Sequence, residues 1–303
     1  MDERATATST VLEASGITKT FPGVKALDNV SLTLNRGEVL SLVGENGAGK
    51  STLTKILSGL YRTDHNSGSI KLNGEEVRFH NSKEAKEHGL ITIFQELSLV
   101  KGLSVAENIF LGNLPRTKLG LIDWAALREK TRNILSEVEL DISPDELAGD
   151  LSISRQQMVE IARALTLGAK VIIFDEPTSS LTETEKDVLF KNIHVLRDKG
   201  VGIIYITHKM DEVFELSDRI TVLRDGKNSG NLETADAKLD DVINLMIGRI
   251  IDDYFHKNEA EKGEEVLKVE GLTSPGIFED ISFFVRQGEV VGLYGLVGAG
   301  RTE

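Results

Sequence analysis

A glycine-rich segment, Gly44-Glu45-Asn46-Gly47-Ala48-Gly49-Lys50-Ser51, has the residue types and spacing needed to hold phosphate. It fits G-x-x-x-x-G-K-S/T, in which glycines let backbone N–H groups close around phosphate oxygens. Residues 39–43 predict a buried strand before it, and 53–60 predict a helix after it, whose N-terminus adds partial positive charge. Lys50 is then placed to reach the β and γ phosphates, and Ser51 to hold Mg²⁺. The order of strand, loop and helix favours nucleotide binding over a glycine-rich turn with an incidental lysine.

Two adjacent carboxylates, Asp175 and Glu176, end a second apolar run at 171–174. Asp175 is suited to control Mg²⁺ and Glu176 to polarise an attacking water. Two acids at a strand end can also cap a turn, but a phosphate loop in the same chain favours the chemical role. His208 follows a third run, 203–206. Although a histidine after a core strand is more often structural, its spacing behind the paired acids makes it a candidate.

The elements that must position these residues follow a doubly wound α/β pattern. The three apolar runs read as central strands covered on both faces, and amphipathic helices follow them. From about 96 to 168 the pattern changes, because strand-like runs are nearly absent. Ser104 and Glu107 form a capping box there, and Asp123 can cap a helix carrying Leu127. We predict a helical insertion into the nucleotide-binding core.

Composition excludes several classes of protein. The 303 residues carry a net charge of −13, which argues against a protein that works by neutralising nucleic-acid phosphates. The chain has no cysteine, so disulfides, Cys–zinc sites and thiol catalysis are excluded. No apolar run approaches the ~18 residues of a membrane span. Residues 1–10 predict a flexible leader without the apolar core of a signal peptide.

The end of the chain repeats its beginning. Residues 37–52 align with 288–303 at a constant offset, and eight of the sixteen positions are identical. Before the second copy, residues 249–265 hold six acids and three bases, which predicts a solvated acidic linker. The second copy, 266–303, stops three residues after Gly300, too early to bury a core of its own. We therefore expect the chain to be part of a longer two-domain protein.

With these pieces in order, the chain resembles the ATP-binding cassette (ABC) family. The matching segments are spread over residues 12–248: Phe21, the phosphate loop, Gln95, LSISRQQMVEIARAL at 151–165, FDEPTSSLT at 174–182, and His208. The resemblance implies an α/β fold with a P-loop NTPase core of the ABC type. That core has a mixed sheet, an antiparallel β subdomain and an inserted helical subdomain, together forming a first cassette at 11–248.

The resemblance also implies roles for individual residues. Phe21 would stack on adenine, and Gln95 would touch Mg²⁺ and the attacking water. The stretch 180–182 would cross a dimer interface, and His208 would contact the γ-phosphate. The resemblance thus implies catalytic residues Glu176, His208 and Gln95, and metal-binding residues Ser51, Gln95 and Asp175. The implied ATP-binding residues are Phe21, Gly44, Glu45, Asn46, Gly47, Ala48, Gly49, Lys50, Ser51 and Thr52.

More narrowly, the chain looks like the tandem ATPase of prokaryotic monosaccharide importers. The matching segments are KTFPGVKALDNVSL, DEPTSSLT, ITHKMDEVFELSD, LMIGR and GLVGAGRTE. In that subgroup two cassettes in one polypeptide drive a transmembrane permease, and a separate binding protein delivers the sugar. The resemblance implies ATP and Mg²⁺ as ligands and a peripheral location on the cytoplasmic face of the membrane. From the net negative charge we expect no nucleic-acid partner. It leaves open which sugar is carried.

Two segments depart from the family pattern. The signature LSGGQ reads Leu151-Ser152-Ile153-Ser154-Arg155 here, without its glycines and Gln. Ser154 with Gln157 is placed to cap the following helix, so we expect the helix to remain while the phosphate contact is in doubt. In the second phosphate loop, Gly295, Gly298, Gly300, Arg301 and Thr302, an Arg stands where the first loop has Lys50. Arg is bulkier and forked, and does not replace a lysine in a tight loop.

Both departures fall on one composite site, because each ATP in a cassette pair lies between one loop and the partner's signature. We therefore predict one hydrolytic and one degenerate site in the full-length protein. Two other readings stay open. One is a soluble tandem-cassette ATPase that acts on ribosomes, against which the short acidic linker counts. The other is a nucleotide-binding fragment without turnover.

Overall fold

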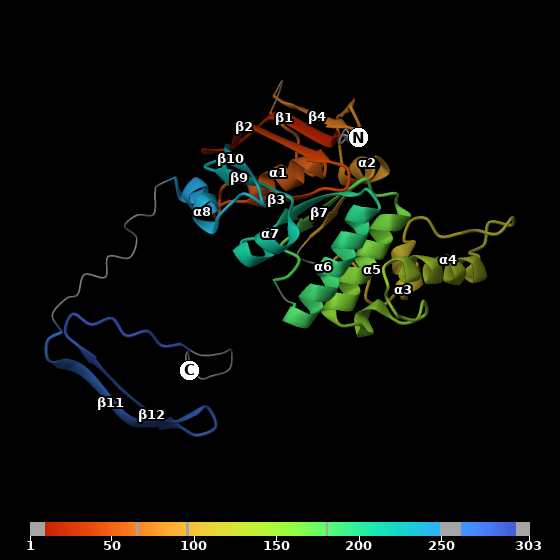
Figure 1. Ribbon diagram of the computed structural model, residues 1–303. Coiled ribbons are helices and arrows are strands. Elements are labelled where there is room, and N and C mark those ends of the chain that lie inside the picture. Colours follow the sequence, from red (N-terminus) through yellow and green to blue (C-terminus); the bar gives the residue numbers. More distant parts are fainter. Residues whose placement is uncertain (1–9, 65–66, 95–96, 180, 249–261, 295–303) are drawn as a thin grey trace, which may run out of the picture. The chain divides into compact units, whose positions relative to one another are not determined.

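The computed structural model describes residues 10–64, 67–94, 97–179, 181–248 and 262–294 (Figure 1). It divides at residue 250 into two compact units. In chain order the elements are β1 (Thr10–Phe21), β2 (Val24–Asn35), β3 (Val39–Val43), α1 (Lys50–Leu57), β4 (Ser69–Leu72), β5 (Glu75–Val77), α2 (Ser82–Glu87), β6 (Leu90–Ile93), α3 (Val105–Ile109), α4 (Trp124–Glu137), η1 (Ala148–Asp150), α5 (Ile153–Thr166), β7 (Val171–Asp175), α6 (Glu183–Asp198), β8 (Gly202–Ile206), α7 (Met210–Leu216), β9 (Arg219–Arg224), β10 (Lys227–Glu233), α8 (Leu239–Ile247), β11 (Glu265–Ser274) and β12 (Phe278–Arg286).

Six strands form the central sheet of the first unit, in the order β10-β9-β3-β8-β7-β6. Neighbours from β9 to β6 are parallel, and β10 pairs antiparallel with β9, so the sheet is mixed. The three strands predicted from apolar runs, β3, β7 and β8, lie side by side at its centre. A second sheet, β2-β1-β4-β5, is entirely antiparallel. The predicted fold class, a mixed sheet with an antiparallel β subdomain, is confirmed.

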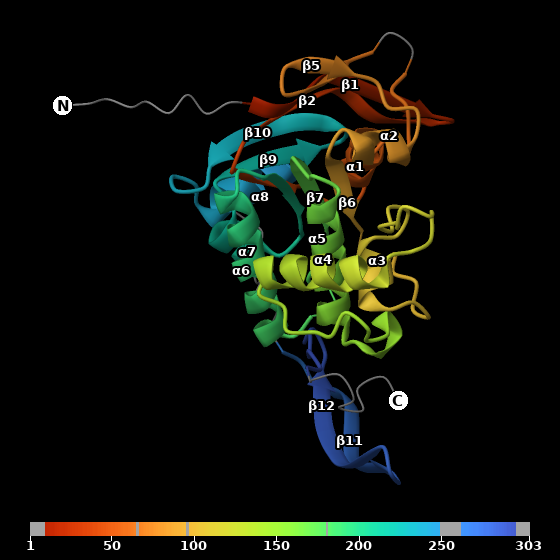
Figure 2. The ribbon, with the colours of Figure 1, turned by 90° about the vertical axis from the view of Figure 1, so that its right-hand side faces the viewer.

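Both faces of the central sheet are buried, as the continuous apolar runs predict. On β7, Val171 and Ile173 pack with the four-stranded sheet and α1. The alternate residues, Ile172 and Phe174, pack with α5 and α6. Figure 2 shows the four-stranded sheet and the helices α4, α5 and α6 on opposite sides of the central sheet. Each fully buried apolar side chain here stabilises the fold by about 1.5–3 kcal/mol.

The described residues between β6 and β7 form the helices α3, α4, η1 and α5 joined by loops, and their only β structure is two isolated bridges. The predicted capping box is confirmed at α3, where Ser104 accepts from the Glu107 amide and Glu107 bonds back to Ser104. Asp123 caps α4, as predicted, by accepting from the Ala126 amide. In the part of the chain that the structure describes, no helix is long and apolar enough to cross a membrane.

Two sequence-based helix boundaries were wrong. The helix after the phosphate loop spans Lys50–Leu57, so it begins within the motif and ends three residues earlier than expected. The cap of α5 is Ser152, which accepts from the Arg155 amide, and not Ser154. Gln157 instead donates to the carbonyl of Pro177 at 3.1 Å. The helix begins earlier than expected: Ser152 has non-helical backbone angles and precedes it, whereas Ser154 already lies within it.

The described part of the second unit is the antiparallel hairpin β11–β12. Its side-chain bonds to the backbone match those of the β1–β2 hairpin. The Gly16 amide donates to Ser31 Oγ at 3.0 Å, and the Gly271 amide donates to Ser282 Oγ at 2.9 Å. The Asn29 and Asp280 amides likewise donate to Thr18 and Thr273, and those of Asn35 and Arg286 to Glu38 and Glu289. The sequence repeat is thus also a repeat of local structure.

The cap assignment predicts unequal effects of two neighbouring serines. Ser152→Ala removes the side-chain acceptor at the start of α5 and is expected to lower the free energy of unfolding by about 0.5–2 kcal/mol. Ser154→Ala, the matched control two residues further on, is expected to change it by less than about 0.5 kcal/mol. Urea titrations of both variants measure the difference. Equal destabilisation, or a larger effect at Ser154, would contradict the assignment.

Candidate functional site

The phosphate loop, the paired acids and the histidine meet at one edge of the central sheet. β8 lies between β3 and β7, with Ile206 beside Leu42 on one side and beside Asp175 on the other. Since these strands are parallel, the chain leaves all three at the same edge. Ligands of open α/β sheets bind outside this carboxyl edge. The register therefore brings together residues that are far apart in the sequence.

The phosphate loop needs glycine at two of its positions. Gly44 has φ +156°, and a Cβ there would lie 2.3 Å from the carbonyl oxygen of Leu223. Gly49 has φ +104°, and a Cβ there would lie 2.8 Å from the carbonyl oxygen of Ala26. Only glycine accepts both the backbone angles and the close approach. The loop is thus packed against β9 and β2, and α1 begins directly after it at Lys50.

Lys50 is buried, and its ammonium points back into the loop. Nζ donates to the carbonyl oxygens of Gly44 at 2.6 Å and Glu45 at 3.1 Å. Burial lowers the pKa of Lys50, while the nearby carboxylates of Glu176 and Asp175 oppose that shift. The loop therefore carries a desolvated cation that is held by dipoles and by two acids.

Asp175, the last residue of β7, faces the same cavity as Lys50. Burial and, next, the Glu176 carboxylate raise the pKa of Asp175, and Lys50 acts in the opposite direction. The cavity measures about 170 Å³, and its lining residues are Ala26, Asn46, Gly47, Gly49, Lys50, Ser51, Thr52, Asp175, Glu176 and Ile206. Ser51 is exposed at the first turn of α1. A cation, a hydroxyl and two carboxylates thus share one small polar pocket.

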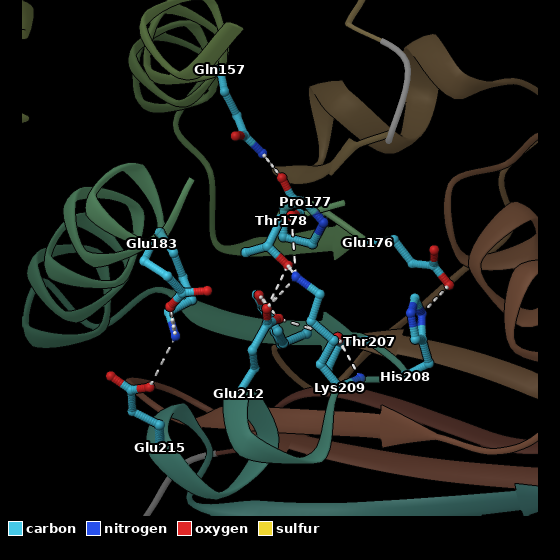
Figure 3. A network of polar contacts seen from close by, with 12 residues as sticks. Gln157, Glu176, Pro177, Thr178, Glu183, Thr207, His208, Lys209, Glu212 and Glu215 are labelled. Carbon is cyan, nitrogen blue, oxygen red and sulfur yellow. Dashed lines mark hydrogen bonds and ion pairs between the residues drawn. The ribbon is translucent and has the colours of Figure 1, made fainter. Parts of the chain in front are cut away.

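Glu176 and His208 lie next to each other (Figure 3), and both line a second, outer cavity. Nδ1 of His208 is 3.3 Å from Oε1 of Glu176. The Glu176 amide donates to Ile206 O at 2.9 Å, and its φ of +49° turns the chain sharply after β7. This outer cavity, of about 580 Å³, is lined by Gly44, Glu45, Asn46, Glu176, His208 and Met246, and the cavity beside Lys50 is the inner one. Glu176 lines both cavities, whereas His208, 60% exposed, lines only the outer one.

Phe21 is the last residue of β1. Its ring packs edge-on against Tyr61, with ring centroids 5.6 Å apart, and the Lys19 ammonium lies over it. Phe21 lines neither cavity described above. The neighbouring strand β2, however, contributes Ala26 to the inner one.

The remaining candidates fall into two groups. Gln95, Ser180 and the second loop with Gly295, Gly298, Gly300, Arg301 and Thr302 lie outside the described residues. The signature segment Leu151-Ser152-Ile153-Ser154-Arg155 forms the start of α5. Among the described residues no hydrogen bond or ion pair joins it to the phosphate loop of the same unit. Leu181 packs in the core beside α5 and α6, and Thr182 caps α6.

Sequence reasoning missed four contributors. Ala26 and Met246 line the cavities, and Tyr61 supports Phe21. Glu212, fully buried on α7, binds groups next to Glu176 and His208. Neither apolar residue carries a chemical signal in the sequence. Tyr61 follows a predicted helix closely and could have been found as an aromatic residue near the loop. Glu212 could not, because an acid in the first turn of a short helix is expected to face solvent.

Comparison with known proteins agrees with this geometry. The sequence model of the family described as ABC transporter matches residues 27–179. The chain is 50% identical over 293 residues to the ribose import ATP-binding protein RbsA 1 of Streptomyces avermitilis, covering 97% of this chain and 55% of that protein. It is 51% identical over 294 residues to a putative ribose/galactose/methyl galactoside import ATP-binding protein of Halalkalibacterium halodurans, covering 97% and 56%. The chain thus spans little more than half the length of these relatives.

The structure is similar to that of MJ1267 in its ADP conformation, which is described as an ATP-binding cassette of an ABC transporter. The two share 27% identity with a TM-score of 0.67, over 79% of this chain and 99% of the other. The likeness therefore extends over most of the first unit.

The raised pKa of Asp175 predicts a pH-dependent gain in stability on its neutralisation. Because the folded state favours the neutral carboxyl, the contribution of Asp175 to the free energy of unfolding is fully present below its ordinary pKa of 3.8. That contribution is lost as the pH rises through the higher pKa of the folded state. Asp175→Asn is therefore expected to raise the melting temperature of the nucleotide-free chain at pH 7.5, and this gain should shrink as the pH falls toward 4. Scanning calorimetry across this range measures it.

The matched control is Asp198→Asn, at the exposed end of α6. We expect it to change the free energy of unfolding by less than about 0.5 kcal/mol at any of these pH values. A gain for Asp175→Asn that is independent of pH, or a loss at pH 7.5, would contradict the electrostatic description.

Proposed function

This chain belongs to the ABC transporter family, and on that premise we propose that it binds Mg-ATP and hydrolyses it to drive the import of a monosaccharide. The observation that carries the proposal is the convergence at one sheet edge of the phosphate loop with Asp175, Glu176 and His208. Each has a role in phosphoryl transfer, in which catalysis is mostly positioning and electrostatics. No single motif would support it as strongly.

The chain's own residues divide the work. The loop amides and the N-terminus of α1 would bind phosphate oxygens, and the Lys50 ammonium would turn from the carbonyl oxygens of Gly44 and Glu45 to the β and γ phosphates. Glu176 would orient the attacking water and accept its proton, and His208 would contact the γ-phosphate. Because Glu176 lines both cavities, it can reach a water lying between them. Phe21, supported by Tyr61, would stack on adenine.

The residues present fit a magnesium ion. Mg²⁺ binds oxygen ligands and usually takes one or two protein carboxylates together with waters and substrate phosphates. The Ser51 hydroxyl and the Asp175 carboxylate lie on the same cavity as Lys50 and would hold it there, and by the family resemblance Gln95 would join them. When bound, the ion would neutralise charge on the β and γ phosphates. The other residues of the site act as described above.

Sugar import is supported by the relatives' names and by their 50–51% identity to this chain. We propose transmembrane permease subunits as direct partners, a separate sugar-binding protein as an indirect one, and a peripheral position at the cytoplasmic face of the membrane. Nucleic acid is not among the proposed partners. The printed names include ribose, galactose and methyl galactoside, so we propose the class of sugar and not its identity.

We further propose that a second cassette follows in the same polypeptide. The β11–β12 hairpin repeats three backbone-to-side-chain hydrogen bonds of the β1–β2 hairpin. Yet its apolar residues Val266, Leu267, Leu272 and Ile281 are 42–64% exposed, while the aligned Val11, Leu12, Ile17 and Val30 are fully buried. A hairpin with this pattern needs a core to cover it. The rest of a second cassette would supply that core.

One composite site of this pair would hydrolyse ATP and the other would be degenerate. The weak signature, Leu151 to Arg155, would face the second phosphate loop with Arg301 in place of lysine. The site built on Lys50, Asp175, Glu176 and His208 keeps its own half intact. Turnover of the full-length protein would therefore depend on one cassette.

Glu176→Gln tests this directly. In the full-length polypeptide we expect it to lower kcat at least about 100-fold, because the water loses its base, while ATP still binds. If two sites worked independently, about half of the turnover would remain. Steady-state phosphate release and titration with a fluorescent ATP analogue measure the two quantities.

Two further variants serve as controls for this measurement. Glu183→Gln, an exposed acid at the start of α6, should turn over like the wild type. Lys50→Ala should lose nucleotide binding itself. Turnover of Glu176→Gln near the wild-type rate would refute both the assigned role and the one-site proposal.

The second cassette predicts the size of the native polypeptide. An antibody against this chain should detect in the source cells a species heavier than 33.2 kDa by about 150–200 residues. A native species at 33.2 kDa would mean that the signature comes from another molecule, and the one-site proposal would be wrong as stated.

A further inference from the structure

A buried carboxylate lies behind the catalytic edge without lining either cavity. Glu212, in the first turn of α7, is fully buried, whereas Glu176 and His208 reach solvent. Its carboxylate is bound by side chains from the two segments that carry those residues, the turn after β7 and the segment after β8 (Figure 3). It is the buried acid of this region that the proposed chemistry does not use.

Four donors converge on this carboxylate. Thr178 Oγ1 donates to Oε1 at 2.7 Å, and Lys209 Nζ lies 3.1 Å from the same oxygen. Tyr205 OH and Thr207 Oγ1 donate to Oε2 at 2.8 and 3.2 Å. Burial and the carboxylate together raise the pKa of Tyr205, so its hydroxyl stays a donor. Both carboxylate oxygens are thus fully used.

The donors also bind one another across the two segments. Lys209 Nζ donates to the carbonyl oxygen and to Oγ1 of Thr178, each at 3.3 Å. The Lys209 amide donates to Thr207 Oγ1 at 3.1 Å. Every member of the network therefore has a partner, and the arrangement is rigid rather than adaptable.

The backbone alone does not join these two segments. Between β7 and β8 the backbone bonds continue to Glu176, whose amide donates to Ile206 O. Past that point, within the described residues, no backbone–backbone bond links residues 177–178 to 207–209. The side chains around Glu212 make the connection instead. They lie directly beside the 3.3 Å contact between Glu176 and His208.

We propose that Glu212 is a positioning residue for ATP hydrolysis, which clamps the turn after Glu176 to the segment that carries His208. The inference rests on the proposed function and adds a residue that does not touch nucleotide. The clamp sets the separation of the Glu176 carboxylate and the His208 imidazole before substrate arrives. Displacements of about 1 Å in such groups lower rates by about 100-fold.

Glu212→Gln tests the proposal with almost no change in side-chain shape. It removes the charge that pairs with Lys209 and presents an amide N–H₂ to hydroxyls that donate. We expect kcat of the full-length polypeptide to fall about 10- to 100-fold, with the Kd of a fluorescent ATP analogue within about twofold of the wild type. Glu215→Gln, the same change one turn along α7 at a partly exposed acid, should leave both unchanged.

A double-variant cycle separates positioning from general stability. Thr178→Val removes one arm of the clamp, and we expect its loss in kcat not to add to that of Glu212→Gln, because both act through one contact. If Glu212→Gln does not fold, Thr178→Val and Thr207→Val carry the test, because each removes a single hydroxyl. Unchanged kcat would overturn the proposal. So would losses in kcat and affinity that follow the folded fraction.

An NMR measurement that does not depend on ATP turnover tests this inference separately from the proposed function. In this chain with isotope-labelled histidine, Glu212→Gln should shift the ring signals of His208 in the NMR spectrum, and Glu215→Gln should not. Unshifted His208 signals in Glu212→Gln would overturn the inference even if the enzyme is an ATPase. Shifted signals in a polypeptide that hydrolyses no ATP would show the clamp and refute the function.

Discussion

The buried ammonium of Lys50 imposes the main electrostatic constraint on this site. Burial opposes its charge, and the carbonyl oxygens of Gly44 and Glu45, with the carboxylates of Asp175 and Glu176, support it. The loop closes around it only because Gly44 and Gly49 lack a Cβ where neighbouring backbone approaches. When phosphate binds, the Lys50 ammonium would therefore exchange these carbonyl oxygens for phosphate oxygens.

The parallel pairing of β3, β8 and β7 brings the phosphate loop and the carboxylates of Asp175 and Glu176 to one edge of the sheet. The backbone hydrogen bonds between β7 and β8 end at Glu176. Beyond that residue, side chains take over from the backbone. The Glu212 network holds the turn after β7 against the segment after β8. Gln157 of α5 donates to Pro177 in the same turn, which ties the helix behind the signature segment to the residue next to Glu176. This hydrogen bond joins the helical region to the turn that follows Glu176.

The sequence was informative where one physical rule decided the outcome. Continuous apolar runs predicted the central strands, and the glycine spacing predicted the loop, because few structures satisfy either pattern. The cap of α5 was misplaced by two residues, since Ser152 and Ser154 have the same side chain and the sequence alone does not distinguish them as caps. Glu212 could not be found, because its burial depends on Tyr205 and Thr178, which lie in other elements. Long-range register and burial are therefore what the sequence alone did not determine.

The most direct test of the central claim is a crystal structure of this chain with Mg²⁺ and a non-hydrolysable ATP analogue. The account predicts that Lys50 Nζ leaves the carbonyl oxygens of Gly44 and Glu45 and lies within hydrogen-bonding distance of the β and γ phosphates. The γ-phosphate should then face Glu176 and His208 at the edge formed by β3, β8 and β7. A nucleotide bound elsewhere, or a Lys50 that keeps its carbonyl partners with the nucleotide in place, would contradict it.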